Sequence, residues 1–183
     1  MRCWLALLAA FGLTACASLA PLRDASTPAV ASADVLTTPL VHFVADGRIA
    51  LRQGERRDHL RFRWEHGPAS DAVLLMSPLG QGVAQLERDA AGARLIRPRQ
   101  PPVIATDMRE LARQVFGAPL PLDRLADHLR GAAQVTAAPV EGWQLTVTET
   151  APFRQRRLLR VLEISRDDVE LKLIVDEWDS NDE

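Results

Sequence analysis

The sequence of 183 residues contains no tyrosine, one lysine, two cysteines and no apolar run long enough to span a bilayer. Because the cysteines are Cys3 and Cys16, the chain beyond its N-terminus has no disulfide framework and no cysteine-based metal site. The formal net charge is −2, which argues against a nucleic-acid-binding protein. These absences exclude disulfide scaffolds and strongly basic binding proteins before any motif is considered.

Motifs for catalysis and for metal binding are also absent. No spacing among the four histidines, or between a histidine and an acid, builds a metal site on a helix. The sequence contains no G-x-S-x-G, P-loop or dinucleotide-binding fingerprint, and nothing near Ser77 provides a base for it. We therefore predict no enzyme activity, no metal and no cofactor, although residues distant in sequence can still assemble in space.

The N-terminus is typical of a secretory signal followed by a lipidation site. Arg2 precedes an apolar run from Trp4 to Leu13, which is too short to cross a bilayer but suits the core of a signal peptide. The sequence LTAC, which ends at Cys16, resembles a bacterial lipobox, in which the chain is cut before an acylated cysteine. We predict that residues 1–15 are cleaved and that Cys16 carries lipid; the alternative is an ordinary signal peptide with an incidental cysteine.

The composition divides the rest of the chain into three parts. Residues 16–39 are rich in Ala, Ser, Thr and Pro, which predicts a flexible tether after the lipidated cysteine. Residues 40–178 are long enough for one domain with a sizeable core, and residues 179–183 form an acidic tail. Aspartate is absent directly after Cys16, so the enterobacterial sorting rule favours the outer membrane.

Alternating apolar and polar residues predict a mainly β fold of the α+β class. In His59–Glu65, three apolar side chains share one face and two arginines and a glutamate share the other. The same reasoning predicts strands at residues 47–52, 73–76, 82–86, 93–97, 143–148, 158–164 and 169–176. The turns between them are short, which is typical of antiparallel pairing.

Two short helices interrupt the strands. Residues 108–115 have apolar side chains at helical spacing, with Asp107 and Glu110 as a capping box and Gly117 as the end. Residues 122–129 repeat the pattern. Helices of this length can cover only part of the apolar face of the sheet, which leaves room for a cavity.

Two faces of the predicted sheet are candidate sites. The apolar face has nine candidate lining residues, for which the alternative is a filled core: Ile49, Leu51, Leu60, Phe62, Trp64, Leu145, Val147, Leu171 and Leu173. The polar face of the first hairpin has four arginines, for which the alternative is an ordinary solvated surface: Arg48, Arg52, Arg61 and Arg63.

A third candidate site is the turn between residues 76 and 82. Pro78 and Gly80 supply turn chemistry, but Leu79 occupies the tip, where a polar residue is usual. Exposing a leucine forgoes roughly 2 kcal/mol of burial. Leu79 therefore either contacts something apolar or folds back onto its own hairpin.

Six motifs follow one another in a fixed order along the chain: LTAC, FVADGRIAL, RFRW, LLMSPLGQ, LPLDRLADHLRG and LKLIVDEW. This ordered set resembles the LolB family of outer-membrane lipoprotein receptors, and the resemblance covers residues 43–178 and the signal region. It implies an unclosed antiparallel β half-barrel of roughly eleven strands, in which short helices form a lid over an apolar cavity. Many relatives have Trp in place of His128, so this detail of the lid is a departure.

The resemblance also implies a function and roles for the candidate residues. We expect a monomeric, lipid-anchored receptor that faces the periplasm, accepts client lipoproteins from a LolA-type periplasmic carrier and inserts their acyl chains into the inner leaflet of the outer membrane. The apolar face would hold acyl chains, and the turn at Pro78, Leu79 and Gly80 would deliver them to the membrane. The four arginines would meet an acidic carrier surface or lipid phosphates.

Three alternatives to this function stay open from the sequence. A periplasmic carrier of the same fold would lack the lipobox. A structural or assembly lipoprotein would bind other proteins and have a filled core. A lipid-anchored hydrolase would need a nucleophile and a base, which no local motif supplies.

Overall fold

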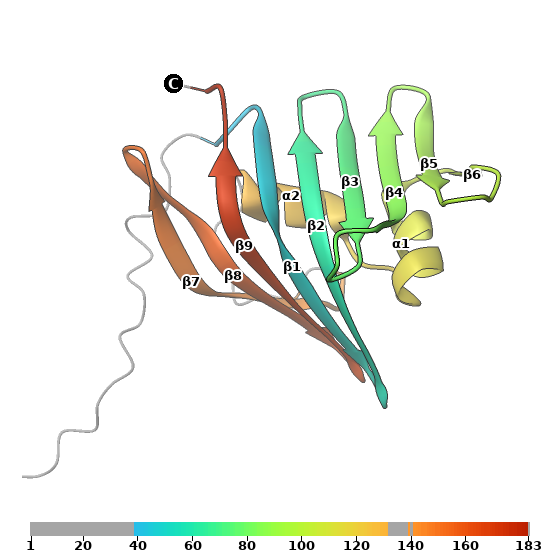
Figure 1. The fold of residues 1–183 in the computed structure, drawn as a ribbon. Helices are drawn as coiled ribbons and strands as arrows, with labels where there is room; N and C mark the ends of the chain where they lie inside the picture. The colour runs from blue at the N-terminus through green and yellow to red at the C-terminus, as the bar shows by residue number, and fades with distance from the viewer. Residues whose placement is uncertain (1–38, 132–138, 140, 183) are drawn as a thin grey trace, which may run out of the picture. The chain divides into compact units, whose positions relative to one another are not determined.

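The computed structural model describes residues 39–131, 139 and 141–182. The predicted signal peptide, the predicted lipid site at Cys16 and the predicted tether up to residue 38 lie outside the described residues. The described part contains one sheet and two helices, which Figure 1 shows in ribbon form.

The sheet consists of strands that pair with their neighbours in an antiparallel sense. The strands are β1 (Phe43–Gln53), β2 (Arg56–His66), β3 (Asp71–Met76), β4 (Gly82–Asp89), β5 (Gly92–Ile96), β6 (Val103–Ala105), β7 (Gln144–Phe153), β8 (Arg156–Arg166) and β9 (Val169–Asp179). Their order is β6-β5-β4-β3-β2-β1-β9-β8-β7. Strands β6 and β7 are the two edges and do not pair with each other, so the sheet is an unclosed half-barrel, as the family resemblance implies.

Both helices lie on the same side of the sheet (Figure 1). Helix α1 (Met108–Phe116) begins at Asp107, whose Oδ1 accepts a hydrogen bond of 2.8 Å from the backbone N–H of Glu110, and ends at Gly117, where φ is +76°. Helix α2 (Leu122–Leu129) follows after a joint of five residues, and each helix buries its apolar stripe. Neither described helix is long and apolar enough to cross a membrane.

The strand predictions are confirmed, with two differences in detail. The predicted turn at residues 53–58 is too long, because β1 and β2 continue to Gln53 and Arg56 and leave only Gly54 and Glu55 between them. Ladder hydrogen bonds join backbone groups, so polar side chains do not end a hairpin. The described residues contain nine strands, where the resemblance implies roughly eleven.

The two edges of the sheet differ in length and regularity. Strand β6 has three residues, and its short, proline-preceded sequence gave no clear strand pattern. Strand β7 has ten residues, but its register with β8 shifts between Val147 and Glu149 and again before Thr150, and it contains Pro152. Bulges and proline are common in edge strands because they interrupt the row of unpaired backbone groups.

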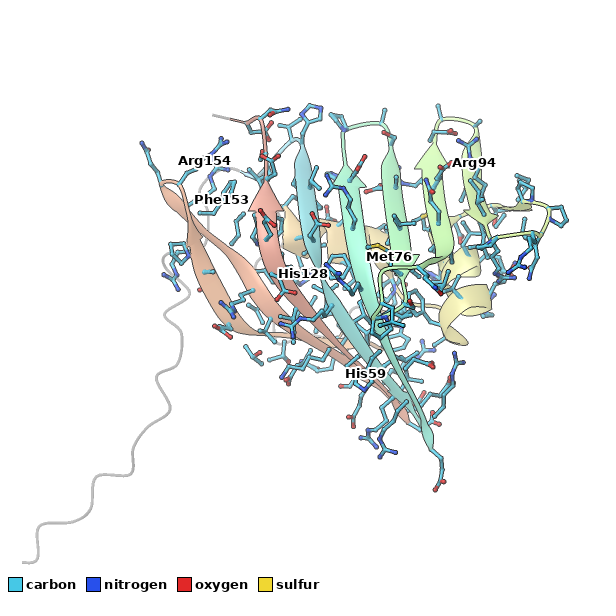
Figure 2. The ribbon with its side chains drawn as sticks, viewed as in Figure 1. His59, Met76, Arg94, His128, Phe153 and Arg154 are labelled. Carbon is cyan, nitrogen blue, oxygen red and sulfur yellow. The ribbon has the colours of Figure 1, made fainter. Side chains whose placement is uncertain are left out.

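The acidic tail is attached to the start of β1. The Asp182 carboxylate accepts hydrogen bonds from the backbone N–H groups of Val41 and His42, and Ser180 Oγ donates to the His42 carbonyl at 2.7 Å. Arg154, labelled in Figure 2 in the turn between β7 and β8, donates to the carbonyl of Ser180 at 2.5 Å. Burial alone would raise the pKa of Asp182, but the hydrogen bonds from His42 and Val41 lower it. These contacts give the tail a structural role.

Candidate functional site

The apolar face of the sheet is turned towards the helices. Because side chains alternate along a strand, every second residue of β1, β2 and β9 points inwards. Seven of the nine predicted lining residues are buried there: Ile49, Leu51, Phe62, Trp64, Leu145, Leu171 and Leu173. Leu60 and Val147 are half-buried and pack against the same core.

A small apolar cavity of about 20 Å³ lies between this face and the helices. Five of the predicted lining residues surround it, namely Ile49, Phe62, Trp64, Leu171 and Leu173. The other four predicted residues are elsewhere on the inner face. A cavity of this volume holds about one water molecule, so the interior is almost filled by the protein's own side chains.

The helices supply the other wall of the cavity, and the sequence analysis did not name these residues as lining. They are Phe116 from the end of α1, Leu120 from the joint, and Leu122 and Leu125 from α2. The helical spacing of the apolar residues was the available signal, because a stripe that covers an apolar sheet must also line any space beneath it. All four side chains are at most 5% exposed.

Gly47 allows β1, β2 and β9 to approach closely beside the cavity. The register of β1 with β9 shifts between Asp46 and Gly47, and the ring of Phe62 lies over the glycine. A Cβ added at Gly47 would overlap the carbonyl oxygen of Ile174 and would lie 2.7 Å from Phe62 Cε1. Only glycine fits at this point, and nothing in the local sequence pattern signals this requirement.

A buried carboxylate fixes the ends of β2, β3 and β4. Asp71 is 5% exposed; it accepts a hydrogen bond of 3.0 Å from Trp64 Nε1 and another of 3.0 Å from Arg88 Nε, and lies 2.6 Å from His66 Nδ1. Burial alone would raise the pKa of Asp71, but the contacts with His66, Trp64 and Arg88 outweigh burial and lower it. Nothing in the sequence pattern predicted this cluster, because its members come from three different strands.

The Leu79 turn is an ordered tip at the opposite end of β3. Ser77 N–H donates to the Gln81 carbonyl at 2.8 Å, Gly80 N–H donates to the Ser77 carbonyl at 2.8 Å, and Gln81 N–H donates to Ser77 Oγ at 3.2 Å. The φ of Gly80 is +84°, a value that glycine adopts readily. The Leu79 side chain is 89% exposed, so it does not fold back onto the hairpin.

Three of the four candidate arginines are already paired with carboxylates. Arg48 makes a bidentate contact with Asp176 at 2.7 and 2.8 Å, and Arg52 makes one with Glu170. A third pairing joins Arg63 to Asp46 at 2.7 Å and to Glu65 at 3.1 Å. Arg61, the fourth arginine, has no such partner among the described residues, so this face carries much less free positive charge than its arginine count implies.

His128 does not occupy a buried position in the helical cover. Its side chain is half-buried on α2, and its Nδ1 lies 2.8 Å from the carbonyl oxygen of Arg124 (Figure 2). A polar ring at this position therefore leaves the packing of Leu125 and Leu129 against the sheet intact. Together, the open antiparallel sheet, the two covering helices and the apolar interior define a β half-barrel protein with a helical lid.

Comparisons with known proteins specify this class further. The family model for outer membrane lipoprotein LolB matches residues 41–178. An outer-membrane lipoprotein LolB from Thiobacillus denitrificans is 35% identical over 186 residues, which cover 93% of this chain and 94% of that protein. The LolB protein from Nitrosomonas europaea is 33% identical over 167 residues, and the aligned region covers 82% of this chain and 77% of that protein. The chain therefore belongs to the LolB family of outer-membrane lipoproteins.

One solved structure shows a weak likeness. A LolA superfamily protein from Nitrosomonas europaea matches with a TM-score of 0.40 and 9% identity, over 83% of this chain and 91% of that chain. The fold described above rests on the strand pairing and not on this match.

Proposed function

We propose that this protein accepts lipoproteins from a LolA-type periplasmic carrier and inserts their acyl chains into the inner leaflet of the outer membrane. The observation that carries the proposal is the apolar cavity, whose walls are a one-sided sheet and two short helices. Each buried methylene contributes about 0.8 kcal/mol, so a long acyl chain gains on the order of 10 kcal/mol in such a site. Acyl chains would not escape into water, and transfer would have to run directly from one shielded site to the next.

Acyl-chain binding requires the helices to move. A methylene group is about as large as a water molecule, and a long acyl chain contains on the order of ten or more of them. The cavity of about 20 Å³ has room for about one such group. We therefore infer that α1 and α2 act as a lid, which separates from the inner face of the sheet to let the chain enter.

The anchor keeps the receptor at its target. Acylation of Cys16 would hold the domain close to the bilayer through the tether of residues 16–39, with the domain facing the periplasm. Such attachment raises the effective concentration of the acceptor membrane without any new contact. Mass spectrometry of the mature N-terminus tests this step, because an acylated Cys16 excludes a soluble periplasmic carrier.

The Leu79 turn would place the receptor against the membrane. A single apolar side chain on an ordered, protruding turn can enter the bilayer interface at little conformational cost. The turn of Pro78, Leu79 and Gly80 is therefore the proposed delivery loop.

A transfer experiment with two variants tests this role. The Leu79→Glu protein should still accept lipoprotein from the carrier but should fail to pass it to liposomes. Ile104→Glu is the matched control, because Ile104 is also an exposed apolar residue, at 73%, and lies on the edge strand β6. Delivery by Leu79→Glu at the rate of the parent protein would contradict the proposed role.

Docking of the carrier through Arg48, Arg52, Arg61 and Arg63 stays a prediction. Because three of these arginines are neutralised by carboxylates, we expect only a modest electrostatic contribution. Transfer from the carrier should slow slightly as the salt concentration rises, and rates that do not change with salt would exclude electrostatic docking.

The alternative function is that of a structural or assembly lipoprotein, and the nearly filled interior favours it. Such a protein would take up no acyl chain. Titration with a fluorescent fatty acid separates the two functions, since the receptor must bind the probe in a saturable way and the structural protein must not.

A further inference from the structure

Three exposed arginines differ from the other cations of the described residues. The other described Lys and Arg side chains make ion pairs or hydrogen bonds. Arg57, Arg61 and Arg99 make neither and are exposed. Their positive charge is therefore not neutralised within the part of the chain that the structure describes.

All three arginines lie at the end of the sheet that carries Leu79. Arg61 pairs with Met76, the last residue of β3 before the Leu79 turn. Figure 2 labels Met76, and Figure 1 shows the end of β3. Arg57 lies on the same face of β2, about 13 Å further along, where β2 continues beyond the end of β3. Arg99 belongs to the turn between β5 and β6, which is at the same end because β4 and β5 are antiparallel.

This spacing does not suit a single small anion. From β2 to β5 there are three strand spacings, or about 14 Å between the backbones, so the three arginines are spread over a surface wider than one phosphate group. A row of separate phosphates, such as the headgroup layer of a bilayer, could contact all three. Guanidinium groups form bidentate hydrogen bonds with phosphate oxygens, and the apolar Leu79 tip between them matches the acyl region beneath the headgroups.

We propose that Arg57, Arg61 and Arg99 form a membrane-docking collar around the Leu79 turn and bind the phosphates of anionic lipids. The collar deepens the proposed function, on which it rests, because it orients the delivery loop at the acceptor membrane. Basic side chains near an anionic leaflet each shift the binding equilibrium by about fivefold, so the three together should contribute on the order of 100-fold.

The test follows the turn at the membrane surface in the full, membrane-anchored protein. Gln81→Cys places a thiol beside the tip, at an exposed position whose hydrogen bonds to Ser77 are made by backbone groups, and this thiol carries an environment-sensitive fluorophore. The parent protein, which lacks this substitution, is treated with the same fluorophore as a control. If it becomes labelled, Cys16 carries a free thiol, which contradicts the proposed acylation of Cys16 and not the collar. The protein is reconstituted in phosphatidylcholine vesicles with or without phosphatidylglycerol, and nitroxide lipids report contact of the tip by quenching.

The expected result is strong quenching on vesicles that contain phosphatidylglycerol at low salt, and weak quenching at high salt. The triple substitution Arg57→Gln, Arg61→Gln and Arg99→Gln should lower the equilibrium constant for docking by on the order of 100-fold. The matched control removes three arginines that are also exposed but are paired with carboxylates: Arg94→Gln, Arg113→Gln and Arg160→Gln. It should dock like the parent.

Two outcomes would overturn the collar. In the first, the triple variant docks like the parent; if it also fails to receive lipoprotein from the carrier, the arginines serve a protein partner. In the second, the control loses docking to the same extent as the triple variant, so the effect is one of net charge and not of these three arginines. The vesicle measurement uses neither carrier nor client lipoprotein, so it tests only the collar. The transfer experiment with Leu79→Glu tests the proposed transfer function separately.

Discussion

Replacing Gly47 with alanine should strongly destabilise the domain. The added Cβ would overlap the Ile174 carbonyl oxygen on β9 and would lie 2.7 and 2.9 Å from two carbons of the Phe62 ring. The ring can rotate or shift, but the carbonyl belongs to the sheet backbone, so β1 and β9 would have to separate. Overpacking of this kind usually costs 1–3 kcal/mol, and contact with backbone places Gly47→Ala at about 3 kcal/mol.

Thermal unfolding followed by circular dichroism measures this effect. For a domain of this size, about 3 kcal/mol corresponds to a fall in Tm of roughly 10 °C. Gly82→Ala is the matched control, because the nearest atom to its added Cβ is Leu74 Cδ1 at 3.9 Å. Its Tm should change little, or rise slightly because the unfolded chain loses freedom.

A double substitution identifies which contact matters. If the backbone overlap dominates, adding Phe62→Leu to Gly47→Ala should not restore stability, because the Ile174 carbonyl still blocks the Cβ. Full recovery in the double variant, or a Tm of Gly47→Ala close to that of the parent, would refute the argument that this glycine sets the approach of β1 and β9.

Three further predictions concern the cluster, the lid and a helix cap. Asp71→Asn should cost about 2–3 kcal/mol near neutral pH in denaturant unfolding. Because folding lowers the pKa of Asp71, its stabilisation is present above the unfolded pKa and is lost as the pH falls below about 4, so the difference between variant and parent should shrink there; a constant difference would be contrary evidence. Leu125→Ala should cost about 2–5 kcal/mol but increase uptake of a fluorescent fatty acid, because it enlarges the cavity; unchanged uptake would count against the cavity as the acyl site. Asp107→Ala should cost about 1 kcal/mol through loss of the α1 cap, and an unchanged Tm would contradict this.

Local patterns predicted the elements of the fold well. The period-two alternation in residues 59–65 and the helical spacing in residues 108–115 depend on which side chains face the core, and the structure follows both. The one missed strand, Val103–Ala105, is short and follows two prolines, so too few residues were available to show a period.

The features that sequence could not predict depend on contacts between distant strands. Asp71 and Gly47 look unremarkable in their local sequence, and their roles appear only when β2, β4 and β9 are placed beside them. The neutralisation of Arg48 and Arg52 is of the same kind, since their acidic partners lie on β9, 128 and 118 residues further along. Leu79 is different, because the turn residues around it placed it at the tip, and the structure then decided between exposure and folding back.

The irregular margins of the half-barrel have a consequence for solubility. An unclosed sheet leaves backbone donors and acceptors unpaired along its two edge strands, and a long, regular edge strand can pair with a strand of another molecule. Here one edge strand, β6, is three residues long, and the other, β7, is interrupted by register shifts and by Pro152. Neither edge strand therefore offers a second copy of the chain a long, regular row of unpaired backbone groups.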